Sequence, residues 1–241
     1  MQINGPSRQA VRWNLICRVS MLAAYLSMTP LAGAETGSCS NPNLTVSVPS
    51  SELRQEVCTA AELALEFLAG LGIQAKYPVR IVIVEQPLHN LTYSAYGCYD
   101  SRSDLVTVMS QQIIHKTSPS PKMFYQPLDQ TQYRGIIAHE VAHALIQQNS
   151  KVLPLPLGTA AQEYLATVTQ LSIMPPAIRD YVIGTADVGP WESGDIITGD
   201  YMAMAPARFA VKSYLHFRQL PDPAKFVDKL LRSKWFYVNV D

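Results

Sequence analysis

Residues 136–145 read Ile-Ile-Ala-His-Glu-Val-Ala-His-Ala-Leu, which contains the pattern H-E-x-x-H at His139, Glu140 and His143. The apolar periodicity around it predicts a helix from about residue 130 to 148. Two histidines four residues apart on a helix lie one turn above each other, so both imidazoles can reach one Zn²⁺ ion. Glu140 projects from a neighbouring position, where it can hold and deprotonate a zinc-bound water.

A different explanation of this stretch is a pair of buried structural histidines, each hydrogen-bonded to a carbonyl or carboxylate. Two histidines on an apolar helix cost desolvation free energy unless something satisfies their nitrogens. That explanation leaves Glu140 in the same apolar stretch without a role, whereas a metal site gives all three residues one. The pattern therefore favours metal binding.

The third ligand is expected from a second helix, predicted from Thr159 to about residue 173 after the helix-breaking Pro154 and Pro156. Glu163 lies on it, twenty residues after His143, and no Asp or Glu stands between Glu140 and Glu163. If the second helix returns antiparallel across the first, Glu163 points at the metal. The alternative is a solvated carboxylate near a helix start, where the macrodipole favours it.

The rest of the chain predicts strands followed by helices, which is an α+β arrangement. Residues 35–50 are rich in Ser, Asn, Thr and Pro, and we expect an irregular entry segment there. The expected elements are a helix from Ser51 to near Gly70, a strand at Val79–Val84, a hairpin of Thr92–Tyr99 with Leu105–Met109, and helices near Pro206–Gln219 and Pro223–Ser233.

With His139, Glu140, His143 and Glu163 in place, the chain resembles the gluzincin group of zinc metallopeptidases from about residue 79 to 173. The resemblance implies a zincin-like fold: a small, twisted, mostly antiparallel sheet, an active-site helix, and a helical C-terminal part. It also implies Zn²⁺ as the cofactor, the two histidines and Glu163 as ligands, and Glu140 as general base. An extended peptide would pair with a sheet edge, and the candidate edges are Thr92–Tyr99 and Leu105–Met109.

The sequence departs from two relatives of this pattern. A metzincin has Gly and His where this chain has Ile146 and Asn149, so that class is excluded. Many gluzincins carry an Asp four residues after the ligand Glu, which orients a ligand His; here that position is Thr167. A Thr hydroxyl or a backbone carbonyl would have to take its place, and loss of such a partner commonly costs ten- to hundredfold in metal affinity or activity.

A hydrogen-bond donor to the transition state is expected from the C-terminal part of the chain. The candidates are Tyr201, Tyr214 and His216, and we select Tyr201 and His216. Tyr214 and His216 stand two apart on one predicted helix, so only one of them can face the metal. For each candidate the alternative is an aromatic side chain of the core or the surface.

The first 34 residues are predicted to be a secretory signal peptide. Arg8, Arg12 and Arg18 precede an apolar run at residues 21–31, and Ala32-Gly33-Ala34 forms an A-x-A cleavage site. The run is too short to span a bilayer, which takes about 20 apolar residues. We therefore expect an exported protein, periplasmic or secreted, with residues 35–241 as one metallopeptidase domain and no membrane anchor after cleavage.

The cysteine count and the composition limit the possible disulfides and the possible partners of the chain. The predicted mature chain keeps Cys39, Cys58 and Cys98, and either Cys39–Cys58 or Cys58–Cys98 can pair in an oxidising compartment. With 48% hydrophobic and 16% charged residues the chain is not disordered, and its formal charge of 0 argues against nucleic acid as a partner. We expect a monomer that acts on a peptide or protein substrate.

Three functions are consistent with these observations. The first is an exported zinc-dependent hydrolase that cleaves peptide bonds with Glu140 as general base. The second is a catalytically inactive zinc-binding domain that uses the same cleft to bind a peptide or envelope component, an idea that Thr167 supports. The third is a structural protein with coincidental histidine spacing, which would bind no metal.

Overall fold

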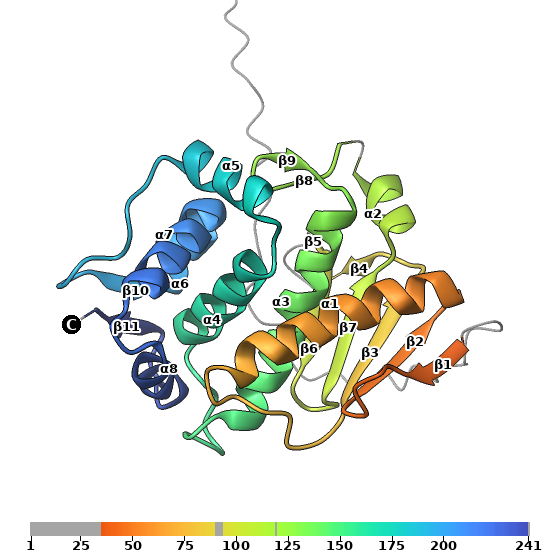
Figure 1. Ribbon diagram of the computed structural model, residues 1–241, viewed down its shortest axis with the longest axis horizontal. Coiled ribbons are helices and arrows are strands. Elements are labelled where there is room, and N and C mark those ends of the chain that lie inside the picture. The colour runs from red at the N-terminus through yellow and green to blue at the C-terminus, as the bar shows by residue number, and fades with distance from the viewer. Residues whose placement is uncertain (1–34, 90–93, 119, 241) are drawn as a thin grey trace, which may run out of the picture.

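The computed structural model describes residues 35–89, 94–118 and 120–240, so the predicted signal peptide lies outside the described residues. The strands of the main sheet gather in one half of the molecule and the helices of residues 159–231 in the other half (Figure 1). Helices α3 (Gln130–Asn149) and α4 (Thr159–Ser172) contact each other at the junction. The predicted α+β class is confirmed.

The main sheet has five strands in the order β1-β2-β3-β7-β6. These are β1 Glu35–Ser38, β2 Leu44–Val48, β3 Val79–Val84, β7 Leu105–Met109 and β6 Gly97–Asp100. The two central pairings, β2 with β3 and β3 with β7, are parallel, whereas both outer pairings are antiparallel. Counted with three two-stranded antiparallel pairs among the described residues, most strand pairings are antiparallel, as predicted.

The expected irregular entry at residues 35–50 is wrong, because β1 and β2 occupy most of it. Leu44, Val46 and Val48 are fully buried and alternate with less buried residues, which is the period of a strand with one covered face. Strand β2 pairs with β1 across a short turn and with β3, more than thirty residues further along the chain. The polar, turn-rich composition of this segment conceals a pair of strands in which alternate residues of β2 are buried.

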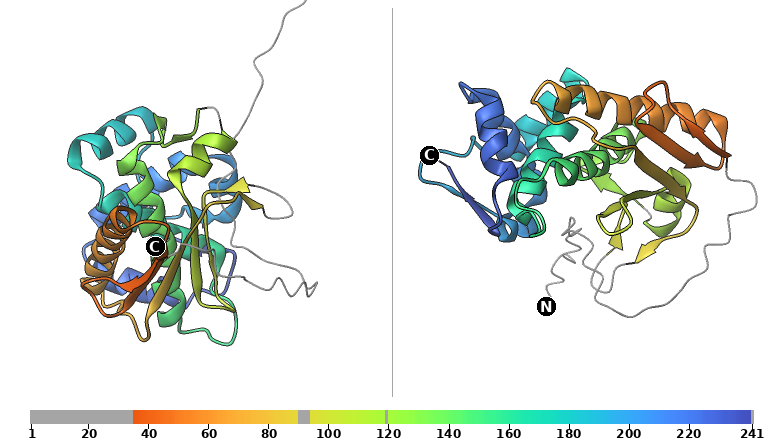
Figure 2. Two further views of the ribbon diagram at one scale, coloured as in Figure 1. Left: turned by 90° about the vertical axis from the view of Figure 1, so that its right-hand side faces the viewer. Right: turned by 90° about the horizontal axis from the view of Figure 1, so that it is seen from below.

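Two helices cover one face of the sheet, α1 (Ser51–Ala69) and α3 (Figure 2). The Ser50 side chain accepts a hydrogen bond from the Leu53 amide and caps α1, and the helix ends at Gly70, as predicted. Helix α1 buries an apolar face against α3 and β2. Helix α3 is enclosed on all sides by α1, α4 and the sheet, which explains why residues 135–146 are all buried.

The C-terminal part is mainly helical. Its elements are α5 Pro176–Ala186, α6 Gly199–Met204, α7 Pro206–Gln219 and α8 Pro223–Leu231, with an antiparallel strand pair of β10 Ile196–Thr198 and β11 Tyr237–Asn239. Helices α7 and α8 confirm the prediction. The sequence reading missed α5, whose helix begins at Pro176, the residue taken as the end of the preceding helix.

Smaller elements complete the described chain. Helix α2 is Gln111–Thr117, and the short strands are β4 Leu88–His89, β5 Ser94–Ala95, β8 Lys122–Met123 and β9 Gln126–Pro127. The last two form a small hairpin in the segment before α3. None of the described helices is both long enough and apolar enough to cross a membrane.

Two contacts tie distant segments to this framework. A disulfide joins Cys39 to Cys58, so β1 and its following turn are fastened to α1. Helix α4 begins after Gly158, where a side chain would collide with the backbone oxygen of Trp235. The Gly158 amide also donates to the Ser233 carbonyl, so the start of α4 lies directly on the C-terminal segment.

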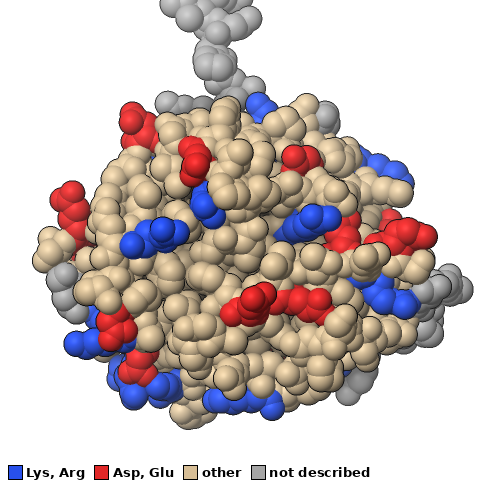
Figure 3. All heavy atoms as spheres, in the orientation of Figure 1, with Lys and Arg blue, Asp and Glu red and all other residues tan. Residues whose placement is uncertain are grey.

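The face of the molecule in Figure 3 carries acidic and basic side chains of both signs, scattered among uncharged residues. No broad area of one sign is visible on that face, in agreement with equal numbers of Lys+Arg and Asp+Glu. This face therefore lacks the extended basic surface that phosphate backbones require.

Candidate metal centre

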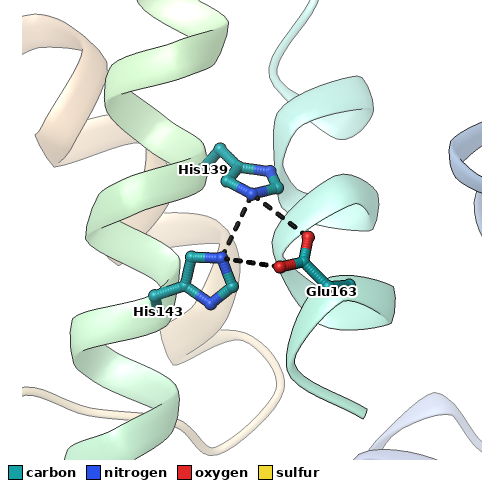
Figure 4. A group of neighbouring side chains, drawn as sticks. All are labelled: His139, His143 and Glu163. Carbon is teal, nitrogen blue, oxygen red and sulfur yellow. Dashed lines mark hydrogen bonds and ion pairs between the residues drawn. The ribbon is translucent and has the colours of Figure 1, made fainter. Parts of the chain in front are cut away.

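His139, His143 and Glu163 point toward one another across the contact between α3 and α4 (Figure 4). The two histidines are exposed by only 6% and 5%, and Glu163 by 2%. The two Nε2 atoms are 3.1 Å apart. The carboxylate oxygens of Glu163 lie 3.5 Å from Nε2 of His139 and 3.6 Å from Nε2 of His143. This group could hold a metal ion.

The spacings of these atoms fit a tetrahedral ion. Two ligand atoms at about 2.0–2.1 Å from Zn²⁺, separated by a tetrahedral angle, are about 3.3–3.4 Å apart. The observed 3.1 to 3.6 Å brackets that value without rearrangement of the three side chains. Two imidazole nitrogens both aimed at the same point cannot each donate to the other, whereas both can donate electron pairs to one cation.

One unsatisfied buried atom supports the same conclusion, because Oε1 of Glu163 has no hydrogen-bond partner among the described groups. Nδ1 of both histidines is also buried without such a partner, but a cation bound at Nε2 would not satisfy it. Buried polar atoms without partners are costly, and native proteins keep few of them. A cation between the three side chains would engage the carboxylate and both Nε2 atoms at once. It would also leave each Nδ1 protonated, as a metal-bound histidine requires.

The Glu163 carboxylate changes the pKa values of both histidines. Burial lowers the pKa of His139, but the hydrogen bond and charge of Glu163 more than offset it, so the pKa is raised. Burial lowers the pKa of His143 to about 4, although the Glu163 charge opposes the change. Metal binding requires both imidazoles to be neutral at Nε2, so a raised pKa of His139 makes the metal affinity fall as the pH is lowered.

Glu140 lies beside the metal group but is not part of it, as the sequence predicts. Its side chain packs against the edge strand β6, where Gly97 has no Cβ; a Cβ there would be 2.7 Å from Cγ of Glu140. Burial raises the pKa of Glu140 to about 7. The charge of His139 and a hydrogen bond from the Tyr99 backbone lower that pKa, while the charge of Glu163 raises it.

The Thr167 hydroxyl does not replace the missing Asp. It donates to the carbonyl of Glu163 at 2.7 Å and approaches the carbonyl of Tyr164 at 3.1 Å, both within its own helix. Such bonding to the preceding turn is the usual local arrangement of a mid-helix Thr. Both of these hydrogen bonds stay within α4, and none joins the Thr167 hydroxyl oxygen to a ligand histidine among the described residues.

The structure directs His216 away from the metal group. Its Nδ1 is 2.7 Å from the Tyr164 hydroxyl, and its ring packs against Phe226 of α8. Tyr164 follows Glu163 directly, and successive side chains on a helix point about 100° apart. His216 thus lies on another face of α4 from the one that carries Glu163, and a role as transition-state donor finds no support in these contacts.

Tyr201 lies in α6, and its ring packs edge-on against Trp191 with 5.3 Å between centroids. Its hydroxyl makes no hydrogen bond to any described residue, so its predicted catalytic role stays a prediction. Tyr214 is buried in α7, and Arg179 lies over its ring. Neither tyrosine shares a hydrogen bond with the metal group in the part of the chain that the structure describes.

The model of DUF6639, described as a family of unknown function, matches residues 44–240. The chain belongs to this family. No curated protein and no solved structure matches the chain. The matched region of this DUF6639 member contains the whole metal group together with Glu140, the edge strand β6 and all helices from α1 to α8.

Sequence reasoning missed three residues around the group: Gly97, Gly135 and Gln170. Gly97 gives Glu140 its space, and Gly135 lies under the side chain of Gln170. A signal for the last two was present, because Gly135 precedes His139 by one helical turn and Gln170 follows Glu163 by two. Their significance depends on which faces of α3 and α4 meet, and a motif search does not supply that.

Proposed function

We propose that this DUF6639 member is an exported zinc-dependent hydrolase, most simply a metallopeptidase. His139, His143 and Glu163 would hold the ion, and Glu140 would act as general base. The observation that carries the proposal is the spacing of 3.1 to 3.6 Å between three buried ligand atoms. Glu140 stands next to them in the chain and lies against an edge strand.

The choice of zinc follows from the donor set. Two imidazole nitrogens and one carboxylate oxygen suit Zn²⁺, whereas Ca²⁺ and Mg²⁺ prefer all-oxygen sites. Three protein ligands are typical of catalytic zinc sites, because the fourth position is left for water or substrate. When bound, the ion would polarise a substrate carbonyl and acidify a water molecule.

Residues of the chain would carry out proton transfer and substrate binding. Glu140 would accept a proton from the attacking water and pass it to the leaving amine. Strand β6 is an edge of the main sheet, and β7 is enclosed between β3 and β6. Of the two edges considered from sequence, β6 is thus the one on which an extended peptide would add as a further strand. Its approach would bring the scissile bond past Glu140.

Export rests on two observations. Residues 1–34 carry the sequence pattern of a signal peptide. The Cys39–Cys58 disulfide suits an oxidising compartment such as a periplasm or the extracellular space. The proposed substrate is therefore an exported or extracellular polypeptide.

Glu140→Gln tests this function, because glutamine keeps the shape of the side chain but cannot accept the proton. We expect about one zinc per chain in the wild type and in the variant, with cleavage of quenched fluorescent casein reduced by about 10²–10⁴-fold in the variant. Glu192→Gln is the matched control, since Glu192 is exposed and remote from α3. Equal cleavage by the wild type and Glu140→Gln would refute the assignment of Glu140.

A second candidate, a zinc-binding domain that binds peptides without cleaving them, has one specific argument. Thr167 and His216 are two residues expected to assist catalysis, but both form hydrogen bonds to groups of α4 instead. This candidate predicts zinc binding and retention of a peptide, with no cleavage by the wild type of casein or of peptide libraries. Zinc-dependent cleavage that is lost in Glu140→Gln would exclude it.

A further inference from the structure

Gln170 is a buried amide on the same face of α4 as Glu163. It follows Glu163 by seven residues, which is two helical turns, and its side chain is 1% exposed. Its Nε2 lies 3.0 Å from the sulfur of Met123. A glutamine is rarely enclosed to this extent unless its amide has a defined partner.

Gly135 makes room for this side chain on α3. A Cβ at Gly135 would be 3.1 Å from Nε2 and 3.2 Å from Cγ of Gln170, and 3.4 Å from the terminal methyl of Met174. Because Gly135 precedes His139 by one turn, the Gln170 side chain crosses from α4 onto α3 beside that histidine. A glycine within a helix lowers its stability relative to alanine, and here it permits the close approach of the Gln170 side chain.

Two buried atoms without hydrogen-bond partners lie in this region. Oε1 of Gln170 and Nδ1 of His139 are both buried, and neither has a hydrogen bond of full geometry to any described group. Gln170 packs against Gly135, one turn before His139 on α3. Nε2 of His139 faces Glu163 and His143, so Nδ1 is the ring nitrogen left for another partner.

We propose that Gln170 is the positioning residue for His139: its Oε1 accepts a hydrogen bond from Nδ1–H when Nε2 binds the metal. The inference rests on the proposed metal site and deepens it. A hydrogen bond at Nδ1 fixes the tautomer in which Nε2 carries the lone pair, and it orients the ring toward the ion. Gln170 thereby takes the role of the acceptor that orients a ligand histidine, for which Thr167 is unsuited. As a neutral acceptor it adds no second buried charge beside Glu163.

Three substitutions at this position separate the hydrogen bond from the packing. Gln170→Met preserves length and volume without an acceptor, Gln170→Asn keeps the amide on a shorter chain, and Gln170→Glu restores an acceptor at full length. Zinc affinity of the full chain is measured by competition with a chelating dye. We expect Met and Asn to weaken affinity by about 10- to 100-fold and Glu to retain it within a fewfold.

Gln132→Met is the matched control. Gln132 is also a buried glutamine, 0% exposed, and both its amide atoms lack partners among the described groups. It lies in the first turn of α3, two turns before His139, so its loss should change stability but leave zinc affinity unchanged. Histidine ¹⁵N shifts give a second readout: zinc-bound wild type should show an Nδ1–H on His139 protected from exchange, and Gln170→Met should not.

The outcomes distinguish this inference from the metal site itself. A wild type that binds no zinc overturns both. A wild type that binds zinc, with Gln170→Met and Gln170→Asn equal to it, overturns the role of Gln170 alone. If Gln170→Met does not fold, the ratio between Gln170→Asn and Gln170→Glu carries the test, and equal affinities for that pair refute the proposal.

Discussion

Histidine side chains lie against two faces of helix α4, and they differ in whether their Nδ1 atoms have hydrogen-bond partners. On the face of Glu163, His139 and His143 have Nδ1 atoms without partners and Nε2 atoms that converge. On the face of Tyr164, His216 is equally buried, but its Nδ1 meets the tyrosine hydroxyl at 2.7 Å. Adjacent residues of one helix thus support a candidate metal group and an ordinary core histidine.

The difference shows that burial alone does not identify a ligand. The Nδ1 of the core histidine has a protein partner, whereas the Nε2 atoms of the two candidate ligands converge on one point that a cation could occupy. The charges around the histidines differ in the same way, because the Glu163 carboxylate faces His139 and His143 whereas the charge of Lys229 acts on His216. The variants below test whether these two faces are as independent as their contacts indicate.

His143→Ala should have the largest effect. Removing one of three ligands should reduce the zinc content from about one per chain to none, measured by elemental analysis of the purified protein. His216→Gln should retain about one zinc, because its partners belong to the other face of α4. Loss of zinc in both variants would show that the two faces are coupled.

Gly97→Ala should separate catalysis from metal binding. The new Cβ would lie 2.7 Å from Cγ of Glu140, so the Glu140 side chain must move. A general base that moves loses its alignment with the attacking water. We expect a loss of cleavage rate approaching 10²-fold with zinc content unchanged. Gly184→Ala, in α5 with open space around it, is the control and should leave the rate unchanged.

Tyr164→Phe addresses the opposite face. It removes the hydroxyl and leaves Nδ1 of His216 buried without a partner, at an expected cost of about 1–3 kcal/mol in the free energy of unfolding. Urea denaturation measures this cost. Zinc affinity should stay within a fewfold of wild type, and a tenfold loss would contradict the separation of the faces.

The smallest effect expected is a pH dependence from His216. Burial, and then the charge of Lys229, lower the pKa of this histidine in the folded state. The folded protein therefore binds fewer protons than the unfolded chain. The resulting stability is fully present above about pH 6.5 and declines as the pH falls toward the lower folded value.

This contribution is isolated by comparing wild type with His216→Gln, both saturated with zinc, in urea between pH 7.5 and 5. The wild type should lose more stability than the variant, with an extra slope of at most about 1.4 kcal/mol per pH unit. Identical slopes would mean that His216 titrates alike in the folded and unfolded states.

Local patterns predicted much of the fold. The helical period of residues 130–148 and the β-branched run Val79–Val84 appear where expected, because each pattern is complete within a few turns of chain. Strands β1 and β2 were missed because Ser, Asn, Thr and Pro are frequent in their segment, and α5 was missed because Pro176 both follows one helix and begins the next. The predicted position of Glu163 opposite the histidines agrees with the geometry found.

The sequence by itself supplied the spacing of His139, Glu140 and His143, since residues one turn apart on a helix meet in any fold that contains the helix. Only tertiary packing turned Glu163 toward them and Tyr164 toward His216, and brought Gln170 over Gly135. Those contacts depend on the angle and rotation at which α4 packs on α3. Many distant side chains set that geometry together, and no short stretch of sequence encodes it.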